Sequence, residues 1–206
     1  GWLTAASALA RKYDGDNPLF IYLPETDFDQ ESFLKDLEKA FETNCNLIVC
    51  VSEGIHDAEG TFICEYDSSV GTDTFGHKML AGCGKYLENL VRSRLGVKAR
   101  SVELNVSQRC SATMISATDQ QEAVAAGKFG VQAALNGETG KMVSFIREAD
   151  ADGNYQMVCG LEDVNEICNQ EKVVPAEWIT PDGHDVTEDF VRYARPLIQG
   201  DVNVPL

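Results

Sequence analysis

Basic side chains are concentrated between residues 92 and 109 of a chain that is otherwise strongly acidic. The 206 residues include 17 Lys and Arg against 33 Asp and Glu, which gives a formal net charge of -16. The planar guanidinium group donates two parallel charge-assisted hydrogen bonds to phosphate oxygens, so this segment is the best candidate for an anion-binding site. A single acid, Glu103, lies among its five cations, which are Arg92, Arg94, Lys98, Arg100 and Arg109.

The same five cations also have a purely structural interpretation. Arg92 and Arg94 would complement the C-terminal end of a helix, where the last carbonyl groups carry partial negative charge. Arg100 and Arg109 would pair with acids on the surface. The charge pattern alone favours this second interpretation, so an anion site needs support from elsewhere in the chain.

Carboxylates follow two of the predicted strands. Glu25 comes after the apolar run 19–23, and Glu53 comes after the apolar run 46–51. Because ligands in layered α/β folds gather at the carboxyl ends of strands, Glu25 is a candidate ligand-binding group. The alternative is that Glu25 is an ordinary solvated side chain of a loop.

Composition and charge exclude several classes of function. A strongly acidic chain is a poor partner for nucleic acid or for an anionic membrane surface, both of which require positive charge. No run of eighteen apolar residues is present, so we expect no membrane span, and the first residues do not form a secretory signal. The three histidines, His56, His77 and His184, have no ligand spacing, so we expect this chain alone to form no metal site.

The cysteines indicate a reducing compartment. Their number is odd, and they form no Cys-x-x-Cys pair. Most lie within apolar runs, so we predict that they are reduced core residues of a cytoplasmic protein. They are Cys45, Cys50, Cys64, Cys83, Cys110, Cys159 and Cys168.

The elements that must position these side chains alternate between strands and helices. The apolar pattern predicts strands over 19–23, 46–51, 99–104, 142–146 and 155–159, the last two joined as a hairpin by the turn 150–154. It predicts helical segments over 2–11, after a cap at Asp29, and over 78–95, 115–135, 161–168 and 186–194. Alternation of this kind predicts an α/β fold with a layered, Rossmann-like sheet flanked by helices.

Seven short segments, taken in order and at their spacing, form a recognisable set. They are Gly1-Trp2-Leu3-Thr4-Ala5-Ala6, Leu23-Pro24-Glu25, Val51-Ser52-Glu53-Gly54, Phe75-Gly76-His77, Val102-Glu103-Leu104-Asn105, Gln108-Arg109-Cys110-Ser111-Ala112 and Ala194-Arg195-Pro196-Leu197-Ile198. Together they resemble the phosphofructokinase family over nearly the whole chain. The similarity is closest to the branch that includes pyrophosphate-dependent enzymes.

The resemblance implies a fold of two facing α/β lobes with a sugar phosphate between them. This chain resembles the second lobe together with the return toward the first. We therefore expect residues 1–112 to form a substrate-binding lobe that is incomplete at its N-terminus. Residues 113–206 would supply a returning helix, a hairpin and a C-terminal helical segment. The start at Gly1, without an initiator methionine, leads us to expect a truncated polypeptide.

The resemblance also implies roles for three residues. Glu25 matches the family glutamate that hydrogen-bonds sugar hydroxyls, and Arg109 matches an arginine that binds the 6-phosphate. Arg100 matches a second phosphate-binding arginine, which in many members reaches the site of a neighbouring subunit, so a homo-oligomer is expected. One departure is Val106, which occupies a position where many short members carry a histidine.

For the intact enzyme, the resemblance implies transfer of a phosphoryl group from pyrophosphate or ATP to the 1-hydroxyl of fructose 6-phosphate. The product would be fructose 1,6-bisphosphate, formed in glycolysis, with Mg²⁺ neutralising the donor oxygens. The Met-Gly-Arg segment, the Gly-Gly-Asp donor loop and the Asp-bearing catalytic loop of the family have no counterpart in this chain. We therefore expect no catalytic residue in it, no Mg²⁺ ligand, and no activity from it alone.

Two alternatives remain open. The chain could be a non-catalytic module that binds sugar phosphate or another subunit. It could also belong to a different α/β phosphotransferase that shares the architecture alone, because fold does not fix function. The sequence does not choose between pyrophosphate and ATP.

Overall fold

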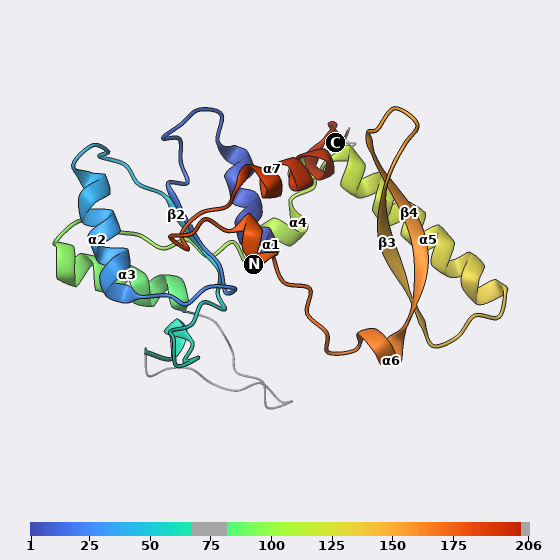
Figure 1. Cartoon of the computed structure of the whole chain (residues 1–206), viewed down its shortest axis with the longest axis horizontal. Coiled ribbons are helices and arrows are strands. Elements are labelled where there is room, and N and C mark those ends of the chain that lie inside the picture. The colour runs from blue at the N-terminus through green and yellow to red at the C-terminus, as the bar shows by residue number, and fades with distance from the viewer. Residues whose placement is uncertain (67–81, 203–206) are drawn as a thin grey trace. The chain divides into compact units, whose positions relative to one another are not determined.

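The structure is a computed structural model that describes residues 1–66 and 82–202. The chain divides into two compact units, each described separately below (Figure 1). The first contains Gly1–Asn105 and Val173–Arg192, and the second contains Val106–Lys172 and Tyr193–Leu206. These units differ from the expected division into 1–112 and 113–206, because a late segment returns to the core of the first unit.

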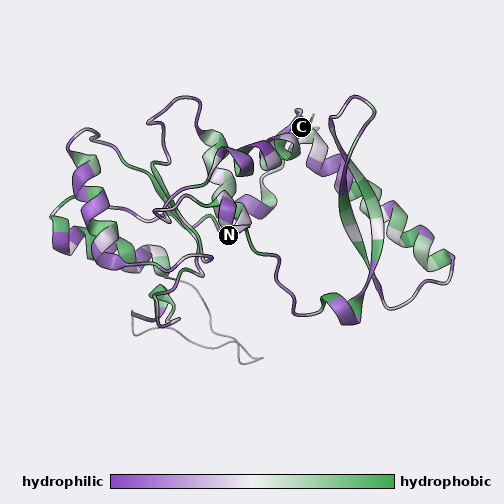
Figure 2. Ribbon diagram, viewed as in Figure 1, coloured by the Kyte–Doolittle hydropathy of each residue, from purple (hydrophilic) through white to green (hydrophobic). Residues whose placement is uncertain are grey.

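The first unit is built on a strand–helix–strand motif. Strand β1 (Phe20–Tyr22) pairs in parallel with β2 (Val49–Val51), and helix α2 (Gln30–Phe41) connects them. The Asp29 side chain accepts a hydrogen bond from the backbone N–H of Ser32 at 2.7 Å, which confirms the predicted cap. The ribbon of α2 alternates between hydrophobic and hydrophilic colours, as expected of a helix with one buried face (Figure 2).

Helices α2 and α3 share the main hydrophobic core of this unit. Helix α3 (Cys83–Leu95) ends at Gly96, whose φ of 67° lies in the left-handed region that favours glycine. Residues 78–81 of the predicted helix lie outside the described residues. The chain begins with α1 (Trp2–Ala5) and the 3-10 helix η1 (Ala6–Ala10). The buried core residues are Tyr22, Phe28, Phe33, Leu34, Leu37, Ile55, Ile63, Cys64, Cys83, Leu87 and Val91.

Residues 173–192 return to the first unit and complete it. The carbonyl of His184 accepts a hydrogen bond from the backbone N–H of Ile21 at 2.8 Å, so the returning segment lies against β1. Arg11 Nη1 donates to both carboxylate oxygens of Asp185 at 2.9 and 2.8 Å. This segment carries the 3-10 helix η4 (Ala176–Trp178), and Val174, Ile179, Val186 and Phe190 are buried.

The second unit combines one long helix with a hairpin. Strands β3 (Lys141–Ala149) and β4 (Tyr155–Asp163) are antiparallel, as predicted, and α5 (Ala117–Leu135) contacts both. A Cβ added to Gly130 would lie 3.3 Å from Val143, so glycine permits the close approach of α5 to β3. The shorter helices that lie wholly or partly in this unit are α4 (Ser107–Cys110), η3 (Ala112–Met114), α6 (Val164–Ile167), α7 (Glu188–Ala194) and η5 (Arg195–Ile198).

Several local predictions are wrong. Residues 99–104 form no strand, because Val102 and Leu104 are exposed and no described strand lies beside them. Helix α4 falls where neither a helix nor a strand was predicted, and residues 161–163 extend β4 instead of starting a helix.

The cysteines differ from the prediction in position. All seven are free, but Cys64 and Cys83 are the buried ones. Three are exposed because they lie in surface turns or short helices: Cys45, Cys110 and Cys168. Among the described residues, no helix is long and apolar enough to cross a membrane.

Candidate functional site

Glu25 lies just beyond the end of β1, where Pro24 directs the chain into a turn. Its Oε1 accepts a hydrogen bond from the backbone N–H of Val174 at 2.9 Å, and the backbone nitrogen of Gly1 is 3.5 Å from the same oxygen. The side chain is 9% exposed. Glu25 is therefore not a solvated loop carboxylate, because two segments distant in sequence enclose it.

The second oxygen of the Glu25 carboxylate is unsatisfied. Oε2 is buried and accepts no hydrogen bond from any part of the chain that the structure describes. A buried carboxylate oxygen without a donor is costly, and such atoms in native proteins call for an explanation. A hydroxyl group of a ligand is a donor of the kind that Oε2 lacks.

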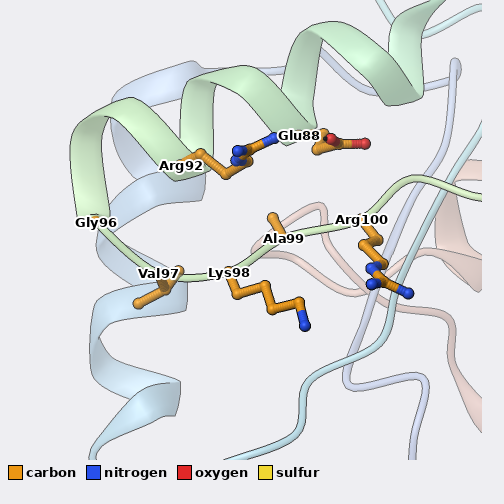
Figure 3. A pocket seen from close by; sticks show the side chains of 7 residues that line it. All are labelled: Glu88, Arg92, Gly96, Val97, Lys98, Ala99 and Arg100. Carbon is orange, nitrogen blue, oxygen red and sulfur yellow. Dashed lines mark hydrogen bonds and ion pairs between the residues drawn. The ribbon is translucent and has the colours of Figure 1, made fainter.

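Arg100 lines a shallow depression of about 500 Å³ between the C-terminal half of α3 and the segment that follows it (Figure 3). Lys98 and Arg100 are exposed, and both project to the side of the segment that faces away from α3. Glu25 does not line this depression. The full set of lining residues is Glu88, Arg92, Gly96, Val97, Lys98, Ala99 and Arg100.

Glu88 fastens the basic segment to α3. Its Oε2 accepts hydrogen bonds from the backbone N–H of Ser101 at 2.9 Å and from the Ser101 hydroxyl at 2.8 Å. Its Oε1 accepts from Lys85 Nζ at 2.7 Å. The Lys85 hydrogen bond and then those of Ser101 lower the pKa of Glu88 to about 2. The carboxylate thus stays charged at neutral pH and holds the chain one residue beyond Arg100.

The five cations of the basic segment fall into two groups. Arg92 lies 3.4 Å from Glu88, and Arg94 forms two 2.9 Å hydrogen bonds with Glu31. Both are in the last turn of α3, as the structural interpretation predicted. For Lys98, Arg100 and Arg109, by contrast, we find no ion pair with an acid of the described chain.

Arg109 is held in the short helix α4 of the second unit. Its backbone N–H and that of Cys110 donate to the carbonyl of Val106, at 3.0 and 3.1 Å. The Arg109 and Val106 side chains are both exposed. An apolar side chain at 106 supplies no hydrogen bond to an anion, and Arg109 is the one cation within α4.

Among residues 1–66 and 82–202, no group of three His, Cys, Asp or Glu side chains is arranged to hold a metal ion. His77 lies outside these residues.

No protein-family model matches the chain. It is 36% identical over 201 residues to pyrophosphate–fructose 6-phosphate 1-phosphotransferase of Methylococcus capsulatus, covering 98% of this chain and 47% of that protein. It is 37% identical over 203 residues to the protein of the same name from Rhodospirillum rubrum, covering 96% of this chain and 49% of that protein. A crystal structure of a pyrophosphate-dependent phosphofructokinase from Marinobacter aquaeolei matches all of this chain and 47% of that one, with a TM-score of 0.80 at 30% identity.

The chain is homologous to the phosphofructokinases. As a phosphofructokinase homologue it has the α/β fold expected from the sequence, and it spans about half the length of the relatives it matches. Sequence reasoning overlooked two parts of the candidate site, Glu88 and the Val174 amide. Glu88 had a weak signal, because it stands four residues before Arg92 on one helix. The Val174 amide had none, because it reaches Glu25 from 149 residues away.

Proposed function

We propose that this chain is the sugar-phosphate-binding part of a phosphofructokinase. The intact enzyme would transfer a phosphoryl group from pyrophosphate, the donor named for the relatives, to the 1-hydroxyl of fructose 6-phosphate. Glu25 would accept a hydrogen bond from a sugar hydroxyl, and Arg100 and Arg109 would bind the 6-phosphate. The acceptor would then be fixed before the donor meets it.

The buried, unpartnered Oε2 of Glu25 is the observation that carries this proposal. It is a strong acceptor without a donor, at the carboxyl end of a parallel strand, where α/β folds bind ligands. Arginines without acid partners supply the complementary requirement, since a sugar phosphate presents hydroxyl donors at one end and a phosphate at the other.

In the proposed reaction, the bond from the transferred phosphorus to the bridging oxygen of pyrophosphate breaks, and a bond to the sugar O1 forms. The proton of the 1-hydroxyl passes to an aspartate base that we place outside this chain, and phosphate leaves. Mg²⁺ would be bound with the donor, also outside this chain. Catalysis in such reactions rests mainly on positioning and electrostatic stabilisation.

Three further properties belong to the same proposal. The enzyme would act in glycolysis, it would be cytoplasmic, as free cysteines favour, and it would be a homo-oligomer. The oligomer would matter for binding if Arg100 reaches the site of a neighbouring copy.

A coupled assay tests the activity. The full-length polypeptide that carries this chain is supplied with fructose 6-phosphate and either pyrophosphate or ATP, and fructose 1,6-bisphosphate is measured. We expect product with pyrophosphate and none from the 206-residue chain alone. Absence of product with both donors would refute the proposed reaction, and product with ATP alone would correct the donor.

A titration separates the enzyme from a binding module. Fructose 6-phosphate is added to the ¹⁵N-labelled chain, and we expect chemical-shift changes near Glu25 and Arg109. Binding by this chain, without activity in the full-length protein, would favour the alternative of a non-catalytic sugar-phosphate-binding or subunit-interaction module. No change at millimolar ligand would mean that this chain does not form the site alone.

A further inference from the structure

Lys98 and Arg100 form a pair of cations that the surrounding structure leaves without acids. The neighbouring cations have acid partners, since Lys85 and Arg92 both contact Glu88 and Arg94 contacts Glu31. No such contact joins Lys98 or Arg100 to any acid within the described ranges. In a chain with a net charge of -16, two unpaired cations on one side of the same segment (Figure 3) indicate a place for an external anion.

The spacing of the two residues suits a single phosphate group. Alternate residues of an extended segment project to the same side and stand roughly 6.6 Å apart along the chain. Lys98 and Arg100 project to the same side of their segment (Figure 3). Two oxygens of one phosphate can therefore accept hydrogen bonds from both side chains at once.

The segment is held in place before any anion arrives. The two hydrogen bonds from Ser101 to Glu88 fix its backbone one residue after Arg100, and Gly96 fixes the turn from α3 two residues before Lys98. The two side chains carry like charges, whose repulsion is unfavourable until an anion lies between them. Binding would relieve this repulsion and would lose little backbone entropy.

We propose that Lys98 and Arg100 together bind one phosphate monoester dianion, and that Lys98 is a further binding residue for the sugar phosphate. The proposal rests on the proposed function, because it takes the phosphate of Arg100 to be that of the substrate. Lys98 contributes a mobile point charge and Arg100 a planar fork, so the lysine adds attraction and the arginine adds orientation.

The test compares four variants of the ¹⁵N-labelled chain, titrated with fructose 6-phosphate and separately with inorganic phosphate at low salt. We expect Lys98→Ala to weaken binding of both ligands about five- to tenfold and Lys98→Arg to retain most of it. The loss should shrink as NaCl rises from 25 to 300 mM, since both cations are exposed. Lys39→Ala, which removes an exposed lysine of α2 in the same unit, should leave the affinity unchanged, and Arg100→Ala completes the set.

The outcomes separate this inference from the proposed function. If Arg100→Ala weakens the binding of fructose 6-phosphate and Lys98→Ala does not, the role of Lys98 alone is overturned. If binding of inorganic phosphate depends on both residues and is as strong as binding of the sugar phosphate, that result would support the anion site and count against the proposed function. No shift at residues 97–101 with either ligand would overturn the inference.

Discussion

Glu88 Oε2 accepts hydrogen bonds from both the backbone N–H and the hydroxyl of Ser101, at 2.9 and 2.8 Å. The two residues are thirteen apart in sequence, and their contact closes the path from α3 to the basic segment. Glu88 therefore holds the segment that carries Lys98 and Arg100, although it forms no hydrogen bond with either of these two side chains.

Replacement of Glu88 should loosen this segment without unfolding the unit. In Glu88→Ala, the amide of Ser101 loses its acceptor, and we expect its hydrogen exchange to accelerate about tenfold or more, with smaller changes across 97–101. Glu38→Ala, which removes an exposed acid of α2, serves as the control. Unchanged exchange at Ser101 in Glu88→Ala would contradict the fastening role.

The same carboxylate should make stability depend on acid. Hydrogen bonds from Lys85 and Ser101 lower the pKa of Glu88 to about 2 in the folded chain, against about 4.3 for an ordinary glutamate in the unfolded chain. The stabilisation is thus fully present above about pH 4.3 and is lost as the pH falls toward 2. The free energy of unfolding of the unchanged chain and of Glu88→Gln should be measured in urea at pH 6, 4.5 and 3.5. The difference between the two free energies should become smaller as the pH falls. A difference that is constant over this range would show that ionisation of Glu88 does not contribute.

Gly1 should be needed for the position of Glu25. A Cβ on Gly1 would lie 2.1 Å from Oε2 and 2.2 Å from Oε1, so Gly1→Ala should displace the carboxylate from the Val174 amide. The Val174 amide would then lose its acceptor, so its hydrogen exchange should be faster in Gly1→Ala than in the unchanged chain. Gly54→Ala is the control, since its Cβ would meet Pro24 at an ordinary 3.6 Å. Equal exchange of the Val174 amide in Gly1→Ala and in the unchanged chain would rule out the predicted displacement.

Arg109 should contribute to substrate binding in the full-length enzyme. Arg109→Ala removes a bidentate donor to phosphate, so we expect KM for fructose 6-phosphate to rise about tenfold or more, with a smaller effect on kcat. Arg109→Lys should recover part of the loss, because it restores the charge without the planar fork. Lys128→Ala, on the exposed side of the same unit, should leave KM unchanged. Normal saturation kinetics in Arg109→Ala would reject this role.

Local elements followed from the sequence wherever a short-range signal decided them. Asp29 marked the start of α2, the apolar spacing up to residue 95 marked the end of α3, and the turn at 150–154 marked the hairpin. Each depends on contacts within a few residues, which a linear pattern records. The strand predicted over 99–104 failed because a strand requires a neighbour, and the pattern of one segment carries no information about its partner.

By itself, the sequence determined the α/β class, the acidic charge, the basic segment and the resemblance to phosphofructokinases. Only the tertiary structure decided which of those charges are free. It paired Arg94 with Glu31 across 63 residues, left Lys98 and Arg100 without acids among the described residues, and brought the Val174 amide to Glu25 across 149 residues. The physical reason is that hydrogen bonds and ion pairs form between groups close in space. The packing of α3 beside α2 sets that closeness for Arg94 and Glu31, and the return of residues 173–192 to β1 sets it for Val174 and Glu25.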